Sequence, residues 1–133
     1  MRPAVFLVFY VLFWPSTASA DPDFRAAVEG IRSAERLIAA ALQTGDDYEL
    51  TTQAGRLLRI QSQLMDGSGR RDERRWACGM AAGDLATIVS LAKRAAKGDQ
   101  PARSLVAAES MEITYRRNLA DCERHIQKAE KRR

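Results

Sequence analysis

The two cysteines, Cys78 and Cys122, have the clearest chemistry in this chain, because a pair of thiols can be oxidised to a disulfide. The midpoint between them is residue 100, which lies in the run Gly98-Asp99-Gln100-Pro101, and glycine and proline are typical of a turn. If antiparallel helices flank this turn, residues whose numbers sum to about 200 lie at the same height. The spacing therefore predicts a disulfide that joins the open end of a helical hairpin.

A second group of candidates consists of polar side chains that interrupt the apolar stripes of the predicted helices. Counted from the nearer turn, they fall in one layer, since a helix rises about 1.5 Å per residue. Arg116 would lie opposite Asp84, where a guanidinium can bind a carboxylate through two parallel bonds. Three interpretations of this layer are open. Its residues form salt bridges that are exposed to water, or a buried polar network that specifies how the helices pack, or an internal site for a cation or small polar ligand. Its members are Glu35, Gln61, Asp84, Glu112 and Arg116.

Motifs for catalysis and for cofactor binding are absent from the sequence. His125 is the one histidine, which excludes a histidine cluster for a metal within one subunit and the Glu-x-x-His pairs of di-iron bundles. Neither cysteine belongs to a Cys-x-x-Cys-His haem attachment motif. There is no glycine-rich phosphate loop and no nucleophile elbow. We therefore expect no enzymatic activity, no cofactor and no metal.

Basic side chains gather in two short stretches, which the predicted disulfide would bring to the same end of the molecule. Acidic residues are interspersed, so this end is either a solvated, salt-bridged surface or a docking surface for an acidic protein, an anionic lipid headgroup or another polyanion. No nucleic acid is expected, because no aromatic residues alternate with the basic ones and the chain is predicted to be exported. The candidates for an interaction surface are Arg70, Arg71, Arg74, Arg75, Trp76, Arg124 and Lys128.

An N-terminal targeting segment precedes the elements that would position these residues. Arg2 supplies a positive charge, Ala4 to Trp14 is continuously apolar, and Ala18-Ser19-Ala20 has the small residues that signal peptidase accepts. The apolar run is shorter than the roughly 20 residues of a membrane span. Residues 1–20 are therefore predicted to be a cleaved signal peptide, with no transmembrane anchor remaining. The mature chain would be periplasmic or secreted, in an oxidising compartment that favours the disulfide.

Four amphipathic helices are predicted in residues 21–133, which we interpret as a single domain. Apolar residues recur at spacings of three and four within each segment. The predicted helices run from about Pro22 to Thr44, from Asp46 to Met65, from Arg70 to Lys97 and from Pro101 to Lys128. Short connections between helices favour an all-α, up-down-up-down four-helix bundle, built as two helical hairpins with one interhelical disulfide.

Together these features predict a small exported helical protein that binds or interacts without catalysis. In this interpretation a rigid helical surface docks on an extracytoplasmic protein, which the basic end of the bundle suggests to be acidic. The alternative is a carrier that holds a cation or a small polar ligand in the mid-bundle layer.

Overall fold

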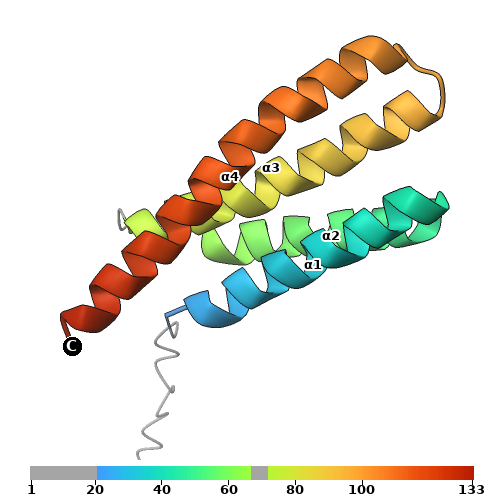
Figure 1. Ribbon diagram of the computed structural model, residues 1–133. Coiled ribbons are helices and arrows are strands. Elements are labelled where there is room, and N and C mark those ends of the chain that lie inside the picture. The colour runs from blue at the N-terminus through green and yellow to red at the C-terminus, as the bar shows by residue number, and fades with distance from the viewer. Residues whose placement is uncertain (1–20, 67–71) are drawn as a thin grey trace, which may run out of the picture.

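The computed structural model describes residues 21–66 and 72–133, and in these ranges the regular structure is entirely α-helical (Figure 1). The helices are α1 (Phe24–Thr44), α2 (Asp47–Leu64), α3 (Glu73–Ala96) and α4 (Pro101–Lys131). The predicted all-α class and the number of helices in this part of the chain are confirmed. The predicted signal peptide, together with Arg70 and Arg71, lies outside the described residues.

Aspartates begin three of the helices. The side chains of Asp23, Asp46 and Asp72 each accept a hydrogen bond from a backbone N–H of the first turn, at 2.9 to 3.0 Å. Such caps satisfy donors that have no partner within the helix. Because Asp23 is the cap, α1 begins at Phe24 and not at the predicted Pro22. Gly45 ends α1 with a φ of 71°, a left-handed conformation that glycine adopts without a steric penalty.

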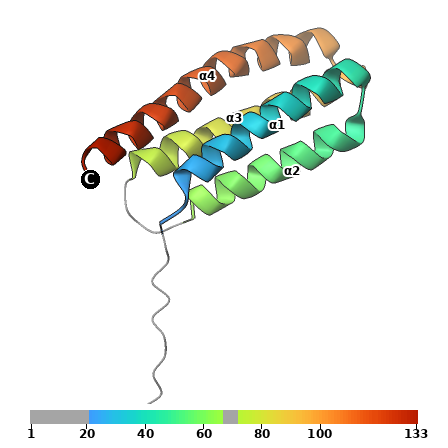
Figure 2. The same ribbon diagram turned by 60° about the horizontal axis from the view of Figure 1, so that its bottom comes forward.

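The helices form two hairpins, α1 with α2 and α3 with α4, and α3 contacts all three other helices. Figure 2 shows α1 lying over α3, with α2 on one side and α4 on the other. Within the described residues α1 touches α3, whereas α2 and α4 do not touch. In cross-section the four helices therefore form a flattened rhombus, with α1 and α3 close together and α2 and α4 far apart, and not a square. Figure 1 also shows the α3–α4 turn standing apart from the α1–α2 turn.

Small side chains on α3 allow this close approach. A Cβ on Gly79 would lie 2.5 Å from Cγ of Met65, and one on Gly83 would lie 2.2 Å from Nε2 of Gln61. The helix is buried on more than the one face that its apolar pattern predicted, because alanine and glycine weaken that pattern while they permit contact on several sides. Its buried residues are Ala77, Cys78, Gly79, Ala81, Ala82, Asp84, Leu85, Ala86 and Val89.

The core has two parts. The larger one lies in the middle of the bundle and includes Ile31, Leu57 and Tyr115, all at most 1% exposed. The smaller one surrounds the disulfide between Cys78 of α3 and Cys122 of α4, whose Cα atoms are 4.7 Å apart. The predicted disulfide is thus confirmed.

Candidate functional site

The mid-bundle layer brings together three of its five predicted members. Glu35 of α1 accepts a hydrogen bond from the Tyr115 hydroxyl at 2.9 Å and pairs with Arg116 of α4 at 2.5 Å. Arg116 also lies 3.6 Å from Glu112, one turn earlier on its own helix. Burial, and then the neighbouring Glu35 carboxylate, raises the pKa of Tyr115. The Arg116 and Glu112 side chains are more than half exposed, at 54% and 58%, so this part of the layer is a salt-bridged cluster that reaches solvent.

Asp84 lies apart from this group, and the predicted pairing of Arg116 with Asp84 is wrong. The Asp84 carboxylate accepts a hydrogen bond from the Asn118 amide at 2.7 Å, on the other side of α4 from Arg116. The sum of residue numbers sets the height of a residue on a helical hairpin, but not the direction in which its side chain points. Two residues further along, α4 has turned by about 200°. Gln61 lies in the seam between α2 and α3, against Gly83.

Because these residues lie in separate seams, the layer does not enclose one chamber. In residues 21–66 and 72–133, no three or more His, Cys, Asp or Glu side chains are grouped so as to hold a metal ion.

Replacing Asp84 with asparagine is expected to stabilise the protein at pH 7, because asparagine carries no charge that must be buried. Asp84 is 7% exposed, and burial raises the pKa of its carboxyl. A raised pKa in the folded state stabilises the protein below the ordinary aspartate pKa, and this contribution is lost as the pH rises through the folded value. The advantage of Asp84→Asn over wild type should therefore shrink toward zero near pH 3. Urea unfolding at both pH values tests this, and an equal difference at the two would contradict it.

Two of the predicted interaction residues, Arg74 and Arg75, bind within the protein. Arg74 makes two hydrogen bonds to Asp72, at 2.9 and 3.1 Å, and its guanidinium lies 4.4 Å from the centre of the Phe24 ring. Arg75 has a side chain that is 16% exposed and donates to the Leu64 carbonyl at 3.4 Å. These arginines secure the disulfide end of the bundle. Arg124 and Lys128 are exposed on α4, and Arg124 pairs with Asp121 at 2.6 Å.

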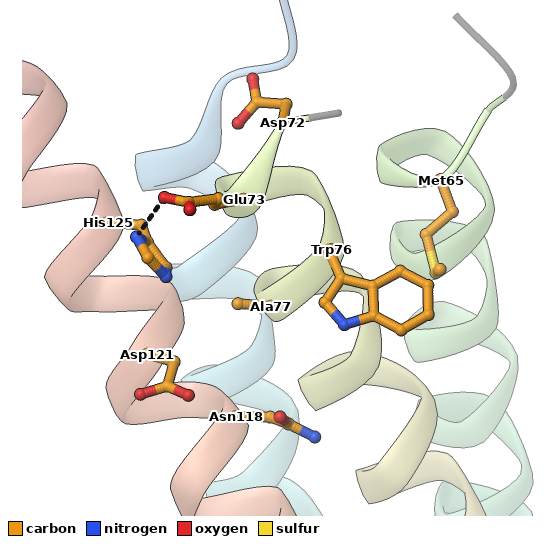
Figure 3. Close-up of a pocket in the computed structure, with 8 residues that line it drawn as sticks. All are labelled: Met65, Asp72, Glu73, Trp76, Ala77, Asn118, Asp121 and His125. Carbon is orange, nitrogen blue, oxygen red and sulfur yellow. Dashed lines mark ion pairs between the residues drawn. The ribbon is translucent and has the colours of Figure 1, made fainter. Parts of the chain in front are cut away.

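Trp76 is 62% exposed and borders a groove of about 630 Å³ between α3 and α4, near the end of α2. Figure 3 shows Ala77 at the floor, Trp76 and Met65 on one side, and His125 and Asp121 on the other. We call this the Trp76 groove. The residues that line it are Met65, Asp72, Glu73, Trp76, Ala77, Asn118, Asp121 and His125.

The groove is rich in carboxylates. Asp72 is neutralised by Arg74, whereas Glu73 lies 3.1 Å from Nδ1 of His125 (Figure 3). The His125 side chain is 23% exposed. The described lining residues include three carboxylates but neither lysine nor arginine. Such a site is suited to bind an apolar group together with a cation.

Sequence reasoning selected Trp76 but not the other walls of the groove. A usable signal was present, because the register that pairs the cysteines also places Glu73 across from His125 and Ala77 across from Asp121.

None of the described helices is both long enough and apolar enough to cross a membrane. Comparisons with protein-family models, with curated proteins and with solved structures find no match to this chain. The functional argument therefore depends on the groove and on the side chains that surround it.

Proposed function

We propose that this chain is a small exported helical protein without catalytic activity, which docks a segment of an extracytoplasmic protein in the Trp76 groove. The observation that carries the proposal is the exposure of the Trp76 side chain, 62%, at the edge of a groove. A large exposed aromatic beside a concave surface is the usual anchor of a protein interface, because it buries much apolar area when a partner covers it.

The disulfide supports this role by fixing the two walls of the groove. Cys78 directly follows Ala77 on the floor, and Cys122 directly follows Asp121 on the opposite wall. A covalent bond at this point keeps α3 and α4 at a constant separation where the partner would bind. A preformed site loses less conformational entropy on binding, which favours affinity.

Export is supported by two independent features. Residues 1–20 have the charge, apolar run and small residues of a cleaved signal peptide. Cys78 and Cys122 form a disulfide, a bond that persists mainly in oxidising compartments outside the cytosol. We therefore place the mature chain, folded as an up-down-up-down bundle, in the periplasm or the extracellular medium.

The carrier alternative has less support. A bound cation or small molecule would have to displace existing interactions, since the Glu35 carboxylate already accepts a hydrogen bond from Tyr115 and pairs with Arg116. The residues that remain, Gln61 and Asp84, lie in other seams.

A photoreactive amino acid placed at position 76 tests the docking proposal. We expect irradiation of cells that export this variant to yield a crosslinked protein adduct. The matched control places the same amino acid at position 48, because Tyr48 is 80% exposed but lies at the opposite end of α2 from the groove. Mass spectrometry of the adducts then identifies the partner. Equal adducts from both positions, or none from position 76, would contradict docking at the groove.

A further inference from the structure

We infer that the segment bound in the Trp76 groove presents a basic side chain, arginine in preference to lysine, beside an apolar one. This inference rests on the proposed docking function and adds the chemistry of the partner. It differs from the expectation of an acidic partner, which depended on the two basic stretches at this end of the bundle; of these residues, Arg74 and Arg75 bind within the protein.

The first argument is the charge of the groove. Once Asp72 is neutralised by Arg74, two carboxylates from opposite walls remain, Glu73 of α3 and Asp121 of α4. Their side chains are 74% and 32% exposed, so both can be reached from solvent. Both carboxylates favour a cation in the groove, whereas they would repel an acidic group.

The present partners of these two carboxylates can be displaced. His125, which lies against Glu73, is charged only when it is protonated. Arg124, which pairs with Asp121, is a neighbour on the same helix with a side chain that is 68% exposed. An exposed ion pair of this kind contributes under about 1 kcal/mol, so a guanidinium that enters the groove can replace it.

The second argument is the shape and chemistry of the side of the groove formed by Trp76 and Met65. Figure 3 shows the flat Trp76 indole across the floor from Asp121 and His125. A guanidinium is planar, stacks on an indole face and can bind a carboxylate at its edge, which an ammonium group does less well. Met65, which is 37% exposed beside Trp76, adds a flexible apolar contact. The combination fits an arginine next to a leucine-like side chain.

The polarity of the surface changes beyond His125. Lys128, Arg132 and Arg74 line an adjoining hollow that shares Asp72, Glu73 and His125 with the groove, so its cations outnumber its carboxylates by three to two. A bound segment with a basic residue in the groove is therefore oriented, because the same residue would be repelled in the hollow. Lys128 and Arg132 thus orient the segment, and the groove recognises it.

Fluorescence titration of the Trp14→Phe protein tests the inference, because Trp76 is then the only tryptophan whether or not the leader is removed. The probes are acetyl-Leu-Arg-Leu-amide and the same peptide with citrulline, a neutral isostere of arginine. We expect the arginine peptide to change Trp76 emission saturably, and to bind about five- to tenfold more tightly than the citrulline peptide.

The double variant Glu73→Gln/Asp121→Asn should abolish this preference for arginine. The matched control is Glu109→Gln, which removes an exposed carboxylate of α4 far from the groove and should leave the preference unchanged. Circular dichroism establishes that each variant keeps its helices.

Three results would overturn the inference: equal affinity for the arginine and citrulline peptides, tighter binding of a glutamate peptide, or binding of free arginine as tight as that of the tripeptide. The two proposals can fail separately. A protein adduct at position 76 without arginine selectivity would retain docking and reject the basic partner. Arginine selectivity without an adduct would instead indicate a site for a small cation and reject docking.

Discussion

Replacement of both cysteines by alanine is expected to lower the free energy of unfolding by about 4 kcal/mol. The disulfide joins residues 44 positions apart, so its loss frees a long loop in the unfolded chain. Urea unfolding of the oxidised protein and of Cys78→Ala/Cys122→Ala, followed by far-ultraviolet circular dichroism, measures the difference. The loss is a large fraction of the roughly 5 to 15 kcal/mol by which a domain of this size is stable.

The control for the disulfide separates the covalent bond from the packing of the sulfur atoms. Both cysteines are 0% exposed, so substitution by alanine also removes buried volume. Wild-type protein refolded in the presence of a reductant keeps both sulfur atoms but lacks the bond. We expect it to lose most of the same free energy. Stability of the reduced protein within about 1 kcal/mol of the oxidised form would show that the crosslink is not the main contribution.

The substitution Leu57→Ala is expected to cost about 3 kcal/mol, within the usual range for truncation of a buried leucine. Leu57 is 0% exposed and belongs to the same core cluster as Ile31 of α1 and Leu85 of α3. The matched control is the next residue, Leu58, which is 52% exposed. Leu58→Ala should change the free energy of unfolding by less than about 0.5 kcal/mol. Equal effects of the two substitutions would contradict the packing of α2 described above.

The same variant tests whether the two hairpins unfold together. In a Trp14→Phe background, Trp76 fluorescence reports on α3, whereas circular dichroism reports on all the helices. If the α1–α2 hairpin and the α3–α4 hairpin form one cooperative unit, Leu57→Ala in α2 shifts both transitions equally. A shift seen by circular dichroism alone would mean that the hairpins unfold independently.

Local features of the sequence were sufficient to predict the helices. The caps Asp23 and Asp46 and the terminating glycine Gly45 act through contacts within a few residues, so their effect depends little on the rest of the fold. The disulfide was also predictable, because the symmetry of Cys78 and Cys122 about the turn sets their relative height and their apolar neighbours set their direction.

The direction of polar side chains around each helix was much less predictable. Arg116 has the height expected for contact with Asp84, but it points to α1 and binds Glu35 instead. Arg74 was expected on the surface because it is charged, yet Asp72 and Phe24 hold it against the protein. A long polar side chain can extend into solvent or fold back against the protein, and its neighbours in the sequence do not decide which of the two occurs.

The helical class, the approximate extent of the helices and the pairing of the two cysteines thus follow from the sequence, since local capping and the periodicity of apolar residues specify them. The Trp76 groove, in contrast, depends on the tertiary structure. Its walls come from the end of α2 and the start of α3, which are close in sequence, and from the second half of α4, which is more than forty residues further along the chain. Packing of the small residues of α3 brings these walls together, and no local pattern specifies which polar side chains then meet there.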